Sequence, residues 1–113
     1  MIVSTSLNYV IKVRLGIMVK LICKRVKFYS HGDEDVFFAW ISKIKVIKKY
    51  EGVGDELHLY VASSKISDKG LREISALFYR YNINMEQLQQ FINEKNSQWY
   101  RDKPGCHHNV FPK

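Results

Sequence analysis

The sequence has very few cysteines, and Cys23 and Cys106 are the only two among its 113 residues. Two cysteines cannot build the disulfide framework that stabilises many small secreted domains. Cys23 lies in a stretch of alternating apolar residues, where a thiol usually serves as a small core side chain. We therefore expect a protein of a reducing compartment whose core holds together without disulfides.

Long apolar runs are also absent. No segment reaches the roughly 18–20 uninterrupted apolar residues that a membrane-spanning helix needs. Residues 1–20 do not resemble a signal peptide, because their basic residues fall within or after the apolar part rather than before it. The sequence therefore predicts no membrane insertion and a cytoplasmic location.

Acidic residues are missing from the first part of the chain, and none precedes Asp33. That part instead carries basic residues, and a second basic group follows it; together they are Lys12, Arg14, Lys20, Lys24, Arg25, Lys27, Lys43, Lys45, Lys48 and Lys49. The net charge of +7 favours anionic partners such as nucleic acid, an acidic protein or a membrane surface. A solvated polar face is the alternative interpretation, because charge also keeps proteins soluble.

A catalytic signature is missing as well. The carboxylates of 33–35, with His31 nearby, are of a type that binds metal or does acid–base chemistry, but acids at a helix start usually interact with the helix dipole. Cys106, His107 and His108 are zinc-ligand types, yet three adjacent residues rarely all face one ion. No local signature of a cysteine nucleophile surrounds either cysteine. We predict no catalytic residue, no metal and no cofactor.

The chain does contain a regular succession of amphipathic segments. Residues 20–29 read as a strand, with Ile22, Val26 and Phe28 on one face. Ser30 begins a helix as a capping residue. The apolar stripe of that helix is Phe37, Trp40, Ile41 and Ile44.

A hairpin and two helices follow this helix. Strands at 45–50 and 56–62 flank the turn residues of 52–55. Residues 66–91 then read as two consecutive helices, capped by Ser67 and Asn84, with Asn82 as a left-handed end to the first. Gln87 would complete a capping box with Asn84.

This order predicts an α+β fold. We expect a two-layer sandwich in the order β-α-β-β-α-α, with a three- or four-stranded mixed or antiparallel sheet and helices packed on one face. Residues 18–103 form the single domain, residues 1–17 an N-terminal extension or extra strand, and residues 104–113 a C-terminal tail. Met18 is a candidate natural start, because the domain pattern begins just after it.

Basic and aromatic residues alternate along the predicted strands. On a sheet face left open by the helices, this combination suits single-stranded nucleic acid. The candidate anion- or nucleic-acid-binding residues are Lys24, Arg25, Lys27, Lys45, Lys48 and Lys49, accompanied by Tyr29, Tyr50 and Tyr60.

A second candidate surface lies on the outer side of the later helices and in the tail. Trp, Tyr and Arg supply most of the binding energy at protein interfaces. The candidate partner-binding residues of this type are Arg80, Trp99, Tyr100 and Arg101. An ordinary solvated surface is the alternative interpretation.

Several segments resemble a group of small uncharacterised bacterial α+β proteins. They are SHGDEDVFFAWI, GVGDELHLYV, LREISALFYRYNINMEQLQQF and WYRDK, and the resemblance covers about Ser30–Lys103. It implies a toxin-neutralising, immunity-type role. The basic charge argues against that role, because immunity proteins that block nucleases are commonly acidic.

The sequence thus favours a non-enzymatic protein that binds another protein, because it carries a well-signalled scaffold and no catalytic set. A nucleic-acid-binding module that uses the basic sheet face is the alternative.

Overall fold

The computed structural model describes residues 18–62, 65–102 and 110–111. Its elements follow the predicted order as far as residue 91, and a further helix at residues 97–102 was not predicted. The elements are β1 (Val19–Lys24), α2 (His31–Lys43), β2 (Ile47–Val53), β3 (Glu56–Val61), α3 (Asp68–Arg80), the 3-10 helix η1 (Met85–Phe91) and α4 (Ser97–Asp102). The predicted α+β fold is confirmed. Residues 1–17 and Cys106–His108, for which we made predictions, lie outside the described residues, as does most of 104–113.

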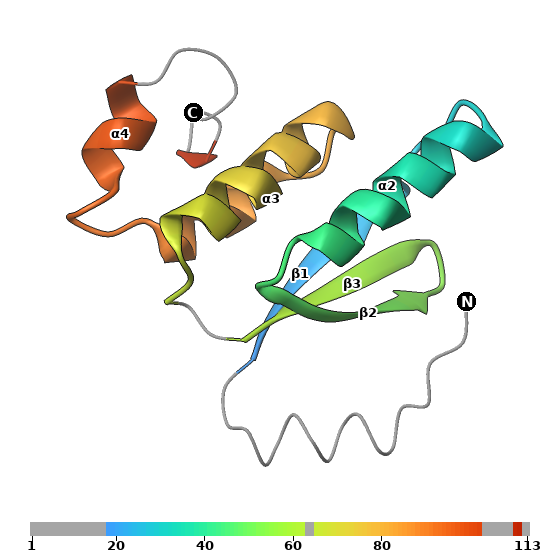
Figure 1. Ribbon diagram of the computed structural model, residues 1–113, viewed down its shortest axis with the longest axis horizontal. Helices are drawn as coiled ribbons and strands as arrows, with labels where there is room; N and C mark the ends of the chain where they lie inside the picture. The colour runs from blue at the N-terminus through green and yellow to red at the C-terminus, as the bar shows by residue number, and fades with distance from the viewer. Residues whose placement is uncertain (1–17, 63–64, 103–109, 112–113) are drawn as a thin grey trace.

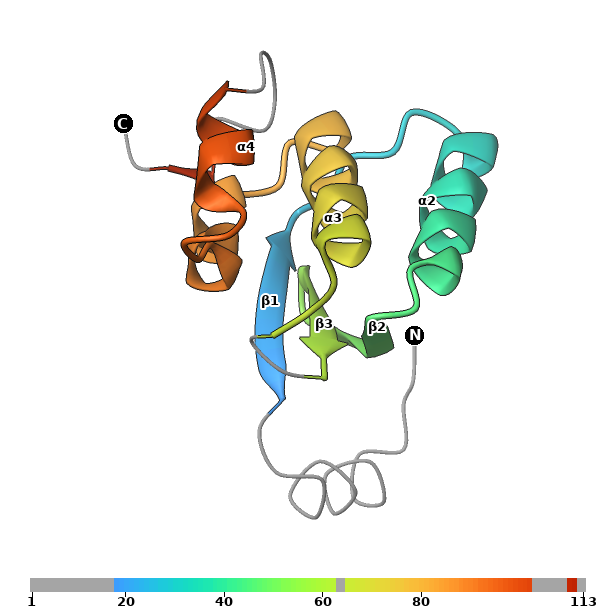
Figure 2. The same cartoon turned by 60° about the vertical axis from the view of Figure 1, so that its left-hand side comes forward.

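The sheet has three strands in the order β1-β3-β2, and both pairings are antiparallel. β2 and β3 form the predicted hairpin, but β2 spans Ile47–Val53 instead of 45–50, so Gly54 and Asp55 alone lie between the strands. Gly54 has a φ of 61°, a conformation that glycine adopts at little cost. β1 joins the other side of β3, so α2 connects the two outer strands. Helices α2 and α3 lie side by side above the sheet (Figure 1), and α4 lies on the far side of α3 from α2 (Figure 2).

The strand register determines which face of β1 packs into the core, and it differs from the apolar face that the sequence predicted. Leu21 and Cys23 pair with Leu59 and Leu57 and are fully buried, whereas Ile22 lies on the opposite face. The prediction treated residues 20–29 as one strand, but β1 ends at Lys24. The alternation therefore does not continue to Val26 and Phe28.

The backbone conformation of Arg25 explains why β1 ends at Lys24. Its φ of 49° is a left-handed conformation that non-glycine residues rarely adopt. Asp55 of the hairpin turn holds it there. The Arg25 backbone N–H donates to the Asp55 carbonyl at 2.9 Å, and Arg25 Nε donates to Asp55 Oδ2 at 2.7 Å.

Helices α2 and α3 begin at the predicted capping residues. The Ser30 hydroxyl accepts from the Asp33 N–H and the Ser67 hydroxyl from the Gly70 N–H, each at 3.1 Å. Asn82 ends α3 with a φ of 57°, as predicted. The apolar stripe of α2 is narrower than predicted, because Trp40 is only half-buried.

The segment after α3 differs from the prediction in type. Residues 85–91 form a 3-10 helix rather than an α-helix, although Met85, Leu88 and Phe91 are buried as expected. Asn84 does cap it, accepting from the Glu86 N–H at 2.8 Å. Gln87 does not complete a capping box, because its Oε1 accepts from β1 rather than from the Asn84 N–H, although its Nε2 donates to the Asn84 carbonyl at 2.8 Å. Ile22 N–H donates to Gln87 Oε1 at 2.8 Å and Gln87 Nε2 donates to the Ile22 carbonyl at 2.9 Å.

Within residues 18–62, 65–102 and 110–111, no helix is both long and apolar enough to span a bilayer.

Candidate partner-binding groove

Exposed apolar side chains gather between α2 and α3. Among the described residues the large exposed hydrophobic side chains are Tyr29, Val36, Val53 and Tyr79. All of these except Val53 line two open hollows of about 460 and 600 Å³ that meet at Trp40 and Arg80. We call this surface the α2–α3 groove. Its lining residues are Lys27, Tyr29, Gly32, Asp33, Val36, Trp40, Ala76, Tyr79, Arg80, Tyr81 and Asn82.

The helical repeat places these side chains along the groove. Val36 and Trp40 are four residues apart and therefore share one face of α2. Ala76 and Tyr79 stand in the same relation, three residues apart, on α3. The small Ala76 side chain leaves space between the helices, while Tyr79 is 58% exposed at the rim.

Two side-chain hydrogen bonds tie the walls of the groove together. Trp40 Nε1 on α2 donates to Glu73 Oε1 on α3 at 3.0 Å. At the other end the Tyr81 hydroxyl donates to Asp33 Oδ1, also at 3.0 Å. The second Asp33 oxygen accepts from the Tyr29 backbone N–H at 3.0 Å. The separation of the helices is thereby fixed, so the groove is preformed.

Tyr81 joins the base of the groove to the core. Its ring contacts Phe37 edge-on, with 4.7 Å between ring centroids, and lies 6.0 Å from Phe28. Burial, with hydrogen bonding to Asp33, raises the pKa of the Tyr81 hydroxyl. The phenol therefore stays protonated near neutral pH and remains the donor to Asp33.

Among the described residues, the acidic side chains of the groove have hydrogen-bond donors as partners, whereas its basic side chains have no ion-pair partner. Asp33 and Glu73 both accept hydrogen bonds from groove residues. Arg80 and Lys27 are exposed cations, and within the described parts of the chain neither has a carboxylate oxygen within 4 Å. Lys27 Nζ lies 5.6 Å from the centre of the exposed Tyr29 ring. The groove thus presents positive charge beside aromatic rings.

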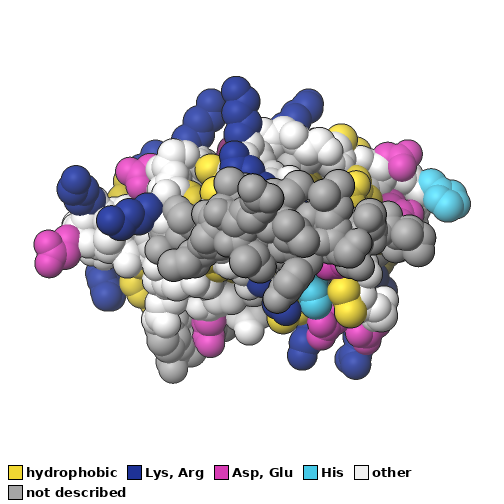
Figure 3. All heavy atoms as spheres, turned by 90° about the horizontal axis from the view of Figure 1, so that it is seen from below, with side chains coloured by type: hydrophobic (Ala, Val, Ile, Leu, Met, Phe, Trp, Pro, Cys, Tyr) yellow, Lys and Arg dark blue, Asp and Glu magenta, His cyan; other side chains and the backbone are white. Residues whose placement is uncertain are grey.

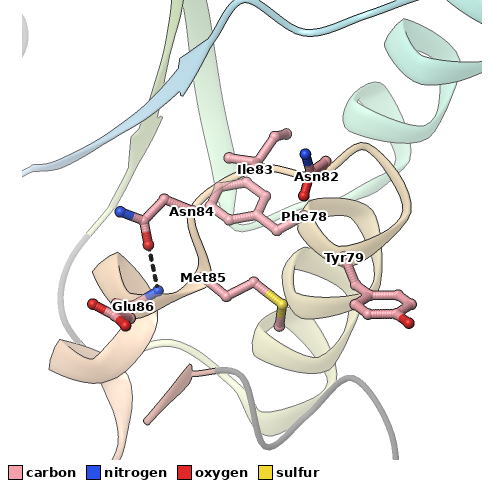
Figure 4. Close-up of a pocket in the computed structure, with 7 residues that line it drawn as sticks. All are labelled: Phe78, Tyr79, Asn82, Ile83, Asn84, Met85 and Glu86. Atoms are coloured by element: carbon pink, nitrogen blue, oxygen red, sulfur yellow. Dashed lines mark hydrogen bonds between the residues drawn. The ribbon is translucent and has the colours of Figure 1, made fainter. Parts of the chain in front are cut away.

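The groove continues around the end of α3. A third hollow of about 260 Å³ lies at the turn into η1 and shares Tyr79 and Asn82 with it. Figure 4 shows Tyr79 projecting outward from α3, away from Asn84 and Glu86 of the turn. Asn84 uses its side-chain oxygen to cap η1. This turn therefore forms an end wall of the groove, and the side-chain oxygen of Asn84 is engaged in capping.

The predicted basic set does not form one surface. Lys27 lines the groove, whereas Arg25 is bound to Asp55 of the hairpin. Lys45 lies between α2 and β2, and Lys48 occupies an irregularity in the β2–β3 register. Seen from below, described Lys and Arg side chains are visible on several sides of the molecule, and Asp and Glu side chains lie among them (Figure 3).

The sheet face opposite the helices is mixed in charge. Lys24 is paired in register with Glu56, which contacts His58 Nε2 at 2.8 Å. Lys49 lies 4.9 Å from the centre of the Tyr60 ring. The Tyr60 hydroxyl donates to Glu51 at 3.2 Å, and burial, together with this bond, raises the pKa of Tyr60. Acidic groups therefore accompany the lysines of this face.

The predicted tail anchors have different environments. Tyr100 is 1% exposed, and its hydroxyl lies 3.3 Å from the buried Ser75 hydroxyl, so it attaches α4 to α3 instead of meeting solvent. Trp99 is half-buried under the Arg72 guanidinium, whose carbon is 3.8 Å from the ring centre. Arg101 lies over the Phe111 ring at 4.3 Å.

Cys23 and the histidines offer little chemistry in the described structure. Burial raises the pKa of the Cys23 thiol to about 12, so the thiol stays protonated and poorly nucleophilic. Among the described residues, no group of three or more His, Cys, Asp or Glu side chains is placed to hold a metal ion.

The sequence indicated only part of the groove. Arg80 was assigned to a partner surface, but Trp40 was assigned to the core and Tyr29 to the sheet face. Val36 carried a usable signal, since it falls outside the apolar stripe of α2. The chain matches no protein-family model, no curated protein and no solved structure.

Proposed function

We propose that this chain is a non-enzymatic protein-binding module whose partner occupies the α2–α3 groove. The observation that carries the proposal is the gathering of Tyr29, Val36 and Tyr79 around Trp40 and Arg80. Clustered exposed apolar side chains commonly mark an interaction surface. Tyr, Trp and Arg are also the residues that most often dominate interface energetics.

The fixed walls of the groove support the same proposal. A surface that is already in its binding shape loses less conformational entropy when a partner docks. The hydrogen bonds from Trp40 to Glu73 and from Tyr81 to Asp33 provide that preorganisation. Neutralisation of a toxin, the role that the sequence resemblance implies, is one form such binding would take.

The chain supplies a matched pair of variants for the test. Val36→Ser removes an apolar side chain inside the groove, and Val53→Ser removes a similarly exposed one at the end of β2, outside it. Tyr79→Ala removes the largest exposed contact on α3. The bait proteins are used for affinity purification from a nuclease-treated lysate of the native host, and the captured protein is identified by mass spectrometry.

The captured partner is then purified, and its affinity for each variant is measured by calorimetry. We expect Tyr79→Ala to weaken binding by about 2 kcal/mol and Val36→Ser by about 1 kcal/mol. Val53→Ser should leave the affinity unchanged. Equal affinities for the wild type and both groove variants would refute the proposal, as would capture that disappears with nuclease treatment.

A further inference from the structure

We propose that the segment received by the α2–α3 groove is acidic and apolar, with a carboxylate placed at Arg80 and Lys27 and a large apolar side chain against Tyr29, Val36 and Tyr79. This inference rests on the proposed function and specifies the chemistry of the partner.

The acidic and basic side chains of the groove differ in whether they have a bonding partner among the described residues. The acidic side chains of the groove are engaged, because Asp33 accepts from Tyr81 and Tyr29, and Glu73 accepts from Trp40. Arg80 and Lys27 have no carboxylate within 4 Å among the described residues. Docking an apolar partner here would partly desolvate these cations, which is costly unless the partner supplies a compensating anion.

The geometry of Arg80 makes a carboxylate the natural anion. A guanidinium presents a planar fork of donors that matches the two oxygens of a carboxylate. Arg80 lines both large hollows, so an acidic side chain bound there has apolar surface on either side. Lys27 lies in only one of them, toward Tyr29, and would add a second, less directional contact.

The hollows provide the apolar component. Their volumes of about 460 and 600 Å³ fall within the range of small-ligand sites, roughly 300–1,000 Å³, and each has room for a side chain of the partner. Tyr29 is 81% exposed and Val36 57%. A Leu, Phe or Trp of the partner would remove their apolar surface from water, which is favourable.

Nucleic acid fits this groove less well than an acidic peptide. Binding to a phosphate backbone relies on several simultaneous cation contacts, and among the described residues the groove lining has only Arg80 and Lys27 as cations. The Asp33 carboxylate also lines the groove, and Glu34 and Asp35 follow it in the same helical turn. These charges repel any anion, and the repulsion grows with the number of negative charges that the ligand brings. A nucleic-acid strand carries one at every phosphate, whereas a short segment can place a single carboxylate at Arg80.

The test uses a random 12-residue peptide library displayed on phage and selected against the full chain. Selected peptides are synthesised with a fluorescent label, and their affinities are measured by anisotropy. We expect net acidic peptides that contain at least one large apolar residue. Arg80→Ala and Lys27→Ala should weaken their binding, the former by about tenfold, whereas Lys45→Ala, which removes an exposed lysine outside the groove, should not.

A charge exchange gives the strongest readout. Arg80→Glu should abolish binding of the selected acidic peptide. A peptide in which the critical Glu or Asp is replaced by Lys should bind Arg80→Glu better than it binds the wild type.

The outcomes separate this inference from the proposed function. Peptides whose binding is lost in Tyr79→Ala but is unaffected by Arg80→Ala would overturn the acidic partner and leave the groove in place. Selection of no peptide, or only of peptides insensitive to Tyr79→Ala, would overturn both. Displacement of the acidic peptide by a thymidine oligonucleotide, with the oligonucleotide itself sensitive to Arg80→Ala, would assign the groove to nucleic acid and also refute the inference.

Discussion

At the scale of single residues, two residues with a left-handed backbone conformation owe it to different causes, one to the local sequence and the other to a distant residue. Asn82 adopts φ 57° at the end of α3, where asparagine is a common helix terminator. Arg25 adopts φ 49° although its side chain does not favour this region. Its conformation depends on Asp55, thirty positions further along the chain. Asn82 was therefore predictable from its neighbours, and Arg25 was not.

Gly70 lies where the neighbouring side chains leave no room for a Cβ atom. A Cβ at this position would lie 2.8 and 2.9 Å from the two methyl carbons of Val46, closer than real Cβ contacts allow. Gly70→Ala should therefore destabilise the fold by about 1 kcal/mol, because overpacking outweighs the gain in helix propensity. Urea unfolding measures this change.

Val46 supplies the control for this prediction. In the double variant Gly70→Ala, Val46→Ala the two methyl groups are absent and Ser67 Oγ, at 3.1 Å, is the remaining close contact. Adding Gly70→Ala to Val46→Ala should therefore cost less stability than adding it to the wild type. A single Gly70→Ala variant more stable than the wild type would contradict the close contact.

At the scale of elements, the two edges of the sheet are treated differently. η1 covers the outer edge of β1, because Gln87 bonds to both the N–H and the carbonyl of Ile22. This side chain takes the place that a fourth strand would occupy and blocks that edge against pairing with another chain. On β2 the register irregularity falls at Lys48. Bulges and lysines are also devices that discourage pairing at an edge.

Removal of Gln87 should therefore loosen β1. Gln87→Ala leaves two half-buried backbone groups of Ile22 without these partners, and we expect a loss of about 1–2 kcal/mol in the free energy of unfolding. The Ile22 amide should also exchange with solvent faster. Gln89→Ala serves as the control, because Gln89 is exposed on the same short helix. An unchanged exchange rate at Ile22 in Gln87→Ala would show that the bond does not protect β1.

At the scale of the whole molecule, the described cations lie on different surfaces rather than in one cluster. Lys27 faces the groove, Lys49 lies on the opposite sheet face, and Arg25 is neutralised by Asp55 at the hairpin. A flexible anion could contact only a few of these cations at once. In our proposal, the cations that matter for recognition are those of the groove.

This distribution makes a prediction for the alternative function. If two or three phosphates are contacted at a time, the logarithm of the affinity for a single-stranded oligonucleotide should fall with the logarithm of salt concentration with a slope of only about −1 to −2. Fluorescence anisotropy between low and physiological salt measures the slope. A slope of about −4 or steeper would indicate a continuous basic track and would favour nucleic-acid binding over the groove proposal.

The candidate site was predicted less completely than the fold, for a physical reason. Helical spacing identified the buried residues of α3, because burial follows the helical repeat. The same rule placed Trp40 in the core, yet Trp40 forms a wall of the groove with Glu73 as its partner. Tyr100 was expected at the surface but fills space beside Ser75. Helical spacing predicts which face of a helix is buried. It does not predict how far the neighbouring elements extend over that face.

The sequence by itself determined the order of the elements up to residue 91, the capping residues Ser30, Ser67 and Asn84, the hairpin and the α+β class. All of these follow from interactions between residues a few positions apart. Only the tertiary structure decided the buried face of β1, the role of Gln87, the dispersal of the basic residues and the existence of the groove. Each of those depends on contacts between distant residues, such as the 65 positions between Ile22 and Gln87. A local sequence pattern cannot predict such contacts, because they form only when the helices pack on the sheet.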